Sequence, residues 1–405
     1  MSKQLLSFFF LSFILSYGIK AQQFEPATMI IGKTADGNAF AHADLDGDGD
    51  EDIIVGGLGR LRWIENDGSG GYLKYHAIAQ DNLDRFPTEI ETGDVNGDGH
   101  IDFLLISSNT SELLLYLNDG TGAFLEGIEI TSSSNFQNLK LADLDGDADL
   151  DLMVSLDNPL NDIRIYENDG NGNFSQVLQL NNVGVGLENI ALGNIGGSAL
   201  PDLVVCSVGD DRLVWLENTG DFSFGEQVLI STDHDSPRKL AIVDLNGDGL
   251  NDIVCSSQSD EELAWFQNTG SGTFSSQNII SVADNLPRFI AADIDNDNDI
   301  DLLADTEGEN YIEFFENDGT GNFSSPVLLS DFRAFPWIAA FDADNDGDID
   351  PVYAVFGQPF RGSLRIIPND DNNGFLPEGF LTYGLNDCEA IDHADLDGDG
   401  WQDVL

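Results

Sequence analysis

Basic side chains are scarce in this chain. Its 405 residues include only 16 Lys and Arg against 73 Asp and Glu, which gives a formal net charge of −57 at pH 7. A surface this acidic repels nucleic acids and anionic membranes and attracts cations. The sequence therefore predicts no nucleic-acid partner, while an apolar content of 41% argues against a disordered acidic chain.

Cysteines are few as well. Cys206, Cys255 and Cys388 are too sparse, and odd in number, for a disulfide framework. Cys206 and Cys255 occupy matching strands of neighbouring repeats, one register apart. A bridge between them is conceivable, but small buried thiols are favoured.

Long apolar runs are also missing beyond the N-terminus. Residues 5–17 are apolar, follow Lys3 and precede a small residue, Ala21. This run is too short to span a bilayer comfortably, and the pattern is typical of a secretory signal peptide over residues 1–21. The alternatives are an N-terminal anchor or a buried helix. We expect a secreted or cell-surface protein, exported by a bacterium, with no transmembrane helix.

One acidic stretch recurs along the whole chain. Its first copy is DLDGDGDED at 44–52, and later copies start at residues 94, 143, 244, 293, 342 and 395. A degenerate copy, NIGGSALPD, lies at 194–202. The period is near 50 residues, which is typical of solenoids and propellers. The acidic RTX-type β-helix is excluded because its repeat is about nine residues.

Each period contains the same four short apolar segments. A buried run such as DIIVGG (52–57) follows the acidic loop, and a strand with an aromatic near its end, such as LRWIEN (61–66), comes next. An NDG or NTG turn then indicates a hairpin, because these residues tolerate positive φ. No segment shows a sustained helical period. We therefore predict an all-β propeller of four-stranded antiparallel blades over residues 22–405.

The D-x-D-x-D-G-x-x-D loops and N-D-G-x-G-x-F turns resemble the FG-GAP/VCBS repeat family. The resemblance covers about residues 24–405. Members of that family are β-propellers and include the heads of integrin α subunits and many secreted bacterial proteins. The resemblance implies this fold and metal binding, and it does not imply one activity.

The acidic loop has the composition of a calcium site. Carboxylates at positions 1, 3 and 5 of a tight loop point inward together, position 7 adds its carbonyl, and the Asp at position 9 can chelate with both oxygens. A flexible, all-oxygen shell suits Ca²⁺, whereas the alternative is a merely polar turn. Glycine occupies position 6 in most copies, where the chain turns sharply. Ala148 and Asn298 replace it in two copies, at a cost of roughly 1 kcal/mol for a left-handed Ala.

These loops predict up to seven Ca²⁺ ions. The degenerate copy keeps only Asn194 and Asp202 of the ligand set, so we expect no ion there. The expected ligands, with position 7 as the fourth residue of each group, are Asp44, Asp46, Asp48, Asp50 and Asp52; Asp94, Asn96, Asp98, His100 and Asp102; Asp143, Asp145, Asp147, Asp149 and Asp151; Asp244, Asn246, Asp248, Leu250 and Asp252; Asp293, Asp295, Asp297, Asp299 and Asp301; Asp342, Asp344, Asp346, Asp348 and Asp350; and Asp395, Asp397, Asp399, Trp401 and Asp403.

The loops divide between two faces of such a propeller. With strands A to D in each blade, the acidic A–B loops and the C–D turns share one face, and the B–C and D–A loops share the other. Most basic residues lie in or beside B–C and D–A connections, among them Arg164, Arg212, Arg238, Lys140 and Lys239. This predicts a ligand face. The alternative is that these bases offset nearby acids, as in GDDR (209–212), and that aromatics such as Phe289 fill blade junctions.

No catalytic motif accompanies the repeats. His42 and His393 take the same place before their loops, on the strand that would line the axis, which favours a channel-lining role. We therefore predict a calcium-stabilised, non-catalytic binding or adhesion module for an extracellular carbohydrate or protein. The alternatives are a polysaccharide-active lyase or hydrolase and a structural module of a larger cell-surface protein.

The two ends of the chain bear on how the ring closes. We expect seven complete blades and a partial eighth, in which residues 29–31 pair with residues 403–405. This arrangement favours eight blades, and a seven-bladed ring with the eighth motif outside it is the rival. The sequence ends inside a strand whose counterparts continue, which indicates a truncated product. We expect a monomeric propeller or part of a longer chain.

Overall fold

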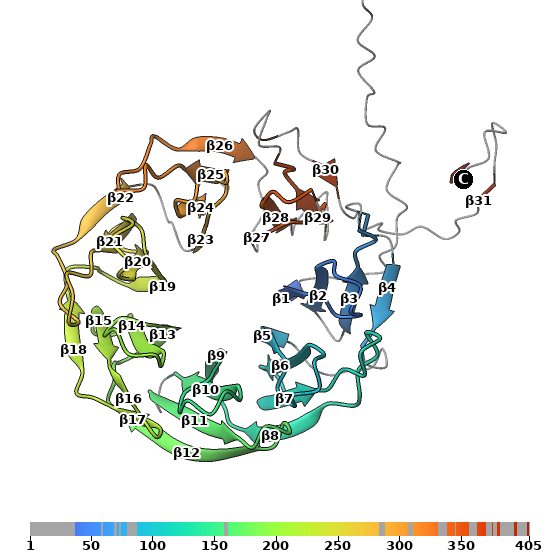
Figure 1. Cartoon of the computed structure of the whole chain (residues 1–405), viewed down its shortest axis with the longest axis horizontal. Coiled ribbons are helices and arrows are strands. Elements are labelled where there is room, and N and C mark those ends of the chain that lie inside the picture. Colours follow the sequence, from blue (N-terminus) through green and yellow to red (C-terminus); the bar gives the residue numbers. More distant parts are fainter. Residues whose placement is uncertain are drawn as a thin grey trace, which may run out of the picture.

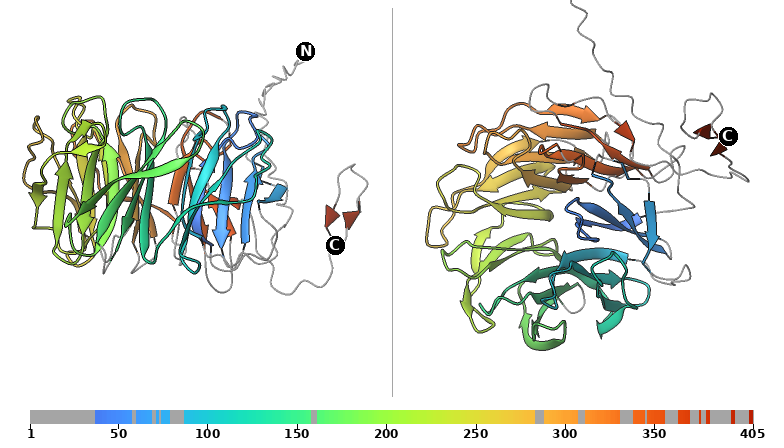
Figure 2. Two further views of the ribbon diagram at one scale, coloured as in Figure 1. Left: turned by 90° about the horizontal axis from the view of Figure 1, so that it is seen from below. Right: turned by 45° about the vertical axis from the view of Figure 1, so that its right-hand side comes forward.

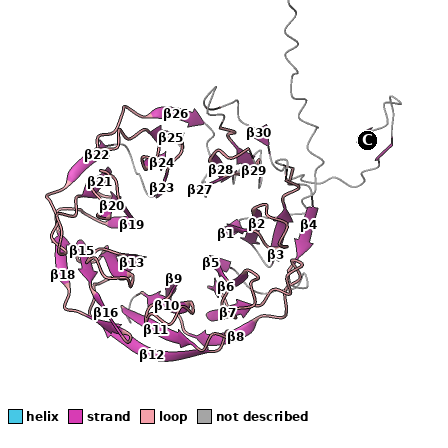
Figure 3. Cartoon of the chain, viewed as in Figure 1, coloured by secondary structure: helices cyan, strands magenta, loops and turns pink. Residues whose placement is uncertain are grey.

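Strands account for all the regular secondary structure in the described part of the protein (Figure 3). The computed structural model describes residues 37–57, 60–68, 71–72, 74–78, 87–157, 161–282, 288–306, 311–330, 338–344, 346–355, 363–369, 375, 379–380, 393–394 and 403–404. Within these ranges no helix is long and apolar enough to cross a membrane. Seven four-stranded antiparallel sheets form a ring, which confirms the predicted propeller (Figure 1).

Each of the first three blades contains one acidic loop between its first two strands, and blade 4 has the degenerate copy at the same place. Blade 1 contains β1 (Gly37–Ala43), β2 (Asp52–Gly57), β3 (Arg60–Glu65) and β4 (Lys74–Ala77); blade 2 contains β5 (Pro87–Gly93), β6 (Asp102–Ser107), β7 (Glu112–Tyr116) and β8 (Ile128–Ser132); blade 3 contains β9 (Phe136–Ala142), β10 (Asp151–Leu156), β11 (Asp162–Asn168) and β12 (Phe174–Asn181); blade 4 contains β13 (Leu187–Gly193), β14 (Asp202–Ser207), β15 (Arg212–Leu216) and β18 (Val228–Ser231), with a small hairpin of β16 (Asn218–Gly220) and β17 (Ser223–Phe224).

The remaining three blades repeat this order. Blade 5 contains β19 (Pro237–Val243), β20 (Asp252–Ser257), β21 (Glu262–Phe266) and β22 (Asn278–Val282); blade 6 contains β23 (Arg288–Ala292), β24 (Asp301–Thr306), β25 (Tyr311–Phe315) and β26 (Val327–Ser330); blade 7 contains β27 (Ile338–Phe341), β28 (Asp350–Val355), β29 (Ser363–Ile366) and β30 (Gly379–Phe380). The first strand of every blade lies innermost, at the axis (Figure 1). The blades form a disc with loops on its two faces (Figure 2).

The core lies between neighbouring blades. The second strands β6, β10, β14 and β20 are buried along their whole length, because both sheet faces pack against another blade. One cluster joins Trp63 of blade 1 to Leu105 and Tyr116 of blade 2. Another joins Ile53 of blade 1 to Phe341 of blade 7. Packing therefore closes the ring.

The described ring has seven blades. The expectation of eight blades was therefore wrong, and the alternative of a seven-bladed ring is confirmed. The eighth motif contributes β31 (His393–Ala394) and β32 (Asp403–Val404), which pair with each other as a separate two-stranded sheet. Residues 1–21 and 24–33 lie outside the described residues. The signal peptide and the N-terminal closing strand therefore stay predictions. Cys206 and Cys255 are buried free thiols, as favoured, and Cys388 lies outside the described residues.

Candidate metal centres

The acidic loops adopt a backbone with two left-handed positions. Position 6 has positive φ whether it is glycine or not, with 99° at Gly49, 77° at Ala148 and 73° at Asn298. This confirms the sharp turn expected there. Position 4 is left-handed too, as at Gly47 with a φ of 79°, which the sequence analysis did not anticipate.

Hydrogen bonds within each loop turn the carboxylates inward. The Asp44 carboxylate accepts the backbone N–H of Gly47 at 2.8 Å and that of Gly49 at 3.1 Å. Asp48 at position 5 accepts the N–H of Asp50 at 3.0 Å. The bonds from position 6 to position 1 and from position 7 to position 5 recur in the five other described acidic loops. The backbone therefore holds these carboxylates in one place.

Four of the loops that the structure describes bring three carboxylates into one cluster, with ligand atoms within 4.8 Å of one another. The four clusters are Asp44, Asp46 and Asp48; Asp143, Asp145 and Asp151; Asp293, Asp295 and Asp297; and Asp342, Asp344 and Asp350. Positions 1 and 3 contribute in every case, and position 5 or 9 supplies the third group. The loops starting at 94 and 244 carry an amide, Asn96 or Asn246, at position 3.

Several of these carboxylates keep a buried oxygen that accepts no hydrogen bond. The oxygen is Oδ1 in Asp46, Asp295 and Asp344 at position 3, and in Asp244 and Asp293 at position 1. Burial, together with neighbouring carboxylates, raises the pKa of Asp46 and takes that of Asp344 to about 6. Unsatisfied buried oxygens surrounded by like charge fit a hard divalent cation. The residues present therefore suit the ion that the loop composition predicts.

The aspartates at position 9 have a second, structural role. Asp52 is fully buried; its Oδ2 accepts the Leu45 N–H at 3.0 Å, and its Oδ1 accepts the Asn66 N–H at 2.8 Å. Burial raises the pKa of Asp52 to about 7. The same pair of bonds is made by Asp102, Asp151, Asp202, Asp252, Asp301 and Asp350. Each oxygen retains a lone pair, so this role is compatible with metal ligation.

One asparagine at or just after the end of the third strand of each blade connects two blades, and all of these except Asn369 open an NDG or NTG turn. We call these residues the turn asparagines: Asn66, Asn118, Asn168, Asn218, Asn268, Asn317 and Asn369. Each buried side-chain amide donates to a backbone carbonyl of the preceding blade, as Asn118 does to Leu45 at 2.7 Å. Asn66 of blade 1 donates to Ala343 of blade 7 at 3.4 Å, which extends the series around the ring.

In the sequence these asparagines indicate a turn and nothing more. In the structure the left-handed residue is the following glycine, such as Gly120 with a φ of 81°. The other five members make the same bond to the preceding blade: Asn168 to Val95, Asn218 to Leu144, Asn268 to Ile195, Asn317 to Leu245 and Asn369 to Ile294. Their recurrence at one place in every repeat was the available signal.

The acidic loops and the NDG turns share one face, as predicted. The backbone bonds from turn asparagines to position 9 join the two segments within each blade. Position 7 also lies against the turn, since the side chains of Asp50, His100 and Asp149 sit over Gly68, Gly120 and Gly170. The eighth loop, residues 395–402, lies outside the described residues, and Asp403 begins β32.

Blade 4 builds the same loop without the carboxylates. Asp202 accepts N–H groups from both Ile195 and Gly196, at 2.9 and 2.7 Å. Asn194 donates its side-chain amide to the Ser198 carbonyl. The loop therefore holds its shape with hydrogen bonds where other loops place acids, and an ion-free blade 4 stays a prediction.

A fifth cluster lies away from the acidic loops and was not predicted. It contains His234, Asp260 and Glu262. The Gln277 amide donates to Glu262 at 2.6 Å and lies 3.3 Å from His234 Nδ1, and Asp260 accepts the Asp235 N–H at 2.6 Å. These bonds account for the cluster without a ligand.

Three of the arginines expected on the opposite face contact acids. Arg164 pairs with Asp162 at 3.5 Å, and Arg212 pairs with Asp210 of the GDDR stretch at 3.8 Å. Arg238 pairs with Glu188 at 2.6 Å. The alternative interpretation, charge compensation, therefore holds for these three. Phe289 is buried in the core between blades 5 and 6, also as that alternative expected.

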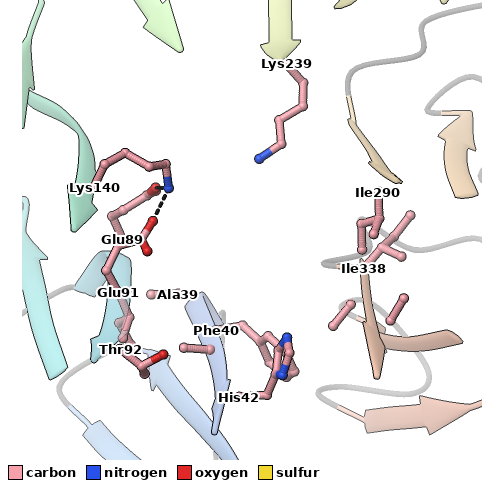
Figure 4. A pocket seen from close by; sticks show the side chains of 14 residues that line it. Ala39, Phe40, His42, Glu89, Glu91, Thr92, Lys140, Lys239, Ile290 and Ile338 are labelled. Carbon is pink, nitrogen blue, oxygen red and sulfur yellow. Dashed lines mark hydrogen bonds and ion pairs between the residues drawn. The ribbon is translucent and has the colours of Figure 1, made fainter. Parts of the chain in front are cut away.

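Two lysines expected in or beside D–A connections lie on the innermost strands. Lys140 and Lys239 are within the innermost strands β9 and β19, and they line the axial cavity (Figure 4). His42 of β1 lines the same cavity, as expected for a channel-lining residue; it stacks on Phe341, with ring centroids 4.6 Å apart, and contacts Glu51.

Comparisons with known proteins agree with this architecture. The family model described as FG-GAP-like repeat matches residues 44–105, 94–154, 195–255 and 244–304. The structure is similar to that of an Agrocybe aegerita lectin that specifically recognises non-reducing terminal N-acetylglucosamine, with a TM-score of 0.60 and 17% identity over 85% of this chain and 89% of the lectin. A chain of the Photorhabdus luminescens Tc holotoxin pore matches with a TM-score of 0.40 and 16% identity, over 80% of this chain and 17% of that one. No curated protein sequence matches.

Proposed function

Because the chain belongs to the FG-GAP-like repeat family, we propose that it is a secreted, calcium-stabilised propeller that binds an extracellular carbohydrate or protein without catalysis. The observation that carries the calcium part is the set of unsatisfied carboxylate oxygens within the loop clusters. Bound Ca²⁺ would supply positive charge to carboxylates that otherwise repel one another. Held at positions 1, 3, 5 and 9, the ion would join the end of the first strand to the start of the second.

The binding part of the proposal concerns the face formed by B–C and D–A loops. Arg212 and Arg238 are paired there, yet their side chains remain 31% and 32% exposed. Arg238 also donates to the Gln258 side-chain oxygen, from Nε at 2.9 Å and from its second terminal nitrogen. A guanidinium has five N–H donors, so both arginines keep N–H groups that a ligand could accept. A carbohydrate-recognising lectin of the same fold supports this reading by analogy only.

The purified chain tests both parts in one design. Thermal unfolding is followed in EDTA, in Ca²⁺ and in Mg²⁺, and the calcium form is applied to a glycan array. We expect Ca²⁺ to raise the melting temperature by many degrees and more than Mg²⁺ does, because the loops offer a flexible oxygen shell. Melting that is indifferent to EDTA would contradict the calcium part. An Arg212→Ala, Arg238→Ala variant that retains full glycan binding would contradict the proposed face.

Two carboxylates in the axial cavity make the alternative function, a polysaccharide-active enzyme, worth testing. Glu89 and Glu91 converge on the axial cavity, and paired carboxylates are the usual machinery of glycoside hydrolysis. Glu91 already contacts the Lys140 ammonium, so this carboxylate is engaged by the protein. Incubation with neutral and acidic polysaccharides, with assays for reducing ends and unsaturated products, should show no turnover. Turnover abolished by Glu89→Gln would replace the binding proposal with the enzymatic one.

A further inference from the structure

The axis of the propeller contains a cavity of about 320 Å³. Its walls are the innermost strands of every blade except the fourth, which contribute Ala39 to His42, Glu89 to Thr92, Lys140, Lys239, Ile290 and Ile338 to Ala340. The size lies at the lower end of the range for small-molecule sites. Figure 4 shows charged side chains on one side of the cavity and Ile290 and Ile338 on the other.

The four charged groups of this cavity are unequally paired. The Lys140 ammonium contacts Glu91 and lies 4.0 Å from Glu89, so it engages both carboxylates. Within the described part of the chain, the Lys239 ammonium makes no ion pair or hydrogen bond, and it points into the cavity (Figure 4). One lysine is therefore satisfied by the protein, and the other is available to a ligand.

Burial makes the free ammonium energetically unfavourable. It lowers the pKa of Lys239, and the positive charge of Lys140 lowers it further, while Glu89 and Glu91 act in the opposite direction. A partly desolvated cation without a counterion is stabilised by any anion that can reach it. The chain as a whole carries a net charge of −57 and repels anions. The buried Lys239 ammonium is therefore the group that would attract an anion into the cavity.

The rest of the wall suits a ligand with hydroxyl groups. The innermost strands pair on one side only, so their other edge presents backbone N–H and C=O groups towards the axis. Thr92 and the two glutamates add a hydroxyl and acceptor oxygens. Ile290, Ile338 and the nearby alanines offer an apolar surface for the C–H groups of a sugar ring.

We propose that the axial cavity binds a small hydroxylated carboxylate of the hexuronic acid class, with its carboxylate on the Lys239 ammonium. The hydroxyl groups bond to Glu89, Thr92 and the strand edges, and the ring packs on Ile290 and Ile338. This inference goes beyond the proposed function, because that function concerns the face formed by the B–C and D–A loops and this site lies on the axis. Either can fail without the other.

Glucuronate is the probe, measured by isothermal titration calorimetry with Ca²⁺ present so that the acidic loops are neutralised. Wild-type protein should bind glucuronate more tightly than glucose, which lacks the charge, and more tightly than acetate, which lacks the ring. Lys239→Met should weaken binding at least tenfold. The matched control is Lys74→Met, which removes an exposed lysine of β4 remote from the cavity and should leave binding unchanged.

Three results would overturn the inference: no measurable binding of glucuronate to wild type, equal binding by Lys239→Met, or equal binding of glucose. Lys239→Met should fold well, because it removes an unpaired charge from the interior. Should that variant prove unstable, Ala340→Leu narrows the same cavity and keeps the lysine. It should also reduce glucuronate binding, and full binding by it would count against the site.

Discussion

The turn asparagines make a testable contribution to stability, and Asn168 is the best placed to measure it. Its side chain is 1% exposed and makes three hydrogen bonds: Nδ2 donates to Val95 at 2.7 Å and to Leu150 at 3.1 Å, and Oδ1 accepts the Gly172 N–H at 3.1 Å. Asn168→Ala removes all three and leaves their backbone partners buried. At about 1 kcal/mol for each bond, the free energy of unfolding should fall by about 3 kcal/mol.

For a chain of this length that loss corresponds to a decrease of about 3–4 °C in melting temperature, measured by calorimetry in Ca²⁺. Asn171 is the matched control, since it is an exposed asparagine in the same turn. Asn171→Ala should shift the transition by less than about 1 °C. Asn168→Asp should be at least as harmful as Asn168→Ala, because a carboxylate cannot donate and would face two carbonyls. Equal melting temperatures for Asn168→Ala and Asn171→Ala would refute the role assigned to the turn asparagines.

Three further predictions follow from the loops and turns. In EDTA, thermal stability should fall as the pH rises from about 4 to about 7. Burial raises the pKa of Asp52 and Asp252 to about 7 from 3.8, so their contribution to stability is fully present below the unfolded pKa and is lost as the pH rises through the folded pKa. Calorimetry at several pH values checks this, and a rise over that window would contradict it. Gly122→Ala should cost at least about 2 kcal/mol in urea unfolding, because φ is 71° and a Cβ would overlap the Trp63 ring, whereas Gly49→Ala has open space and should cost only about 1 kcal/mol. Native mass spectrometry should count at most seven Ca²⁺ ions, with the count unchanged by Asp202→Asn; a lower count in that variant would show that blade 4 binds metal.

Much of the fold could be predicted because its signals are local. The period, the strand runs and the position 6 turns are properties of single repeats, and Ala148 and Asn298 adopt the left-handed conformation assigned to them. The number of blades could not be predicted with the same certainty. It depends on how blades pack on one another, as between Ile53 and Phe341, and no single repeat encodes that contact.

The candidate site divides in the same way. Carboxylate clusters follow from spacing along one loop, so most of the ligand set could be named in advance. The turn asparagines and Lys239 act across blades, and sequence spacing does not show which groups meet across the ring. The sequence places Lys239 only in or beside a D–A connection, and nothing in it shows that β19 begins at Pro237 and carries the lysine along the axis.

The direction of the asparagine bonds has a consequence for the order of assembly. From blade 2 to blade 7, each turn asparagine donates to a carbonyl of the blade before it. The acceptor is therefore already synthesised when each of these asparagines is added to the chain. Asn66 is the exception, since its acceptor, Ala343, is made 277 residues later. Within blade 1 the Asn66 amide also donates to the Glu51 carbonyl and the Tyr72 hydroxyl. Its bond across the ring can form only after blade 7 is made, so the nascent protein is an open arc until then.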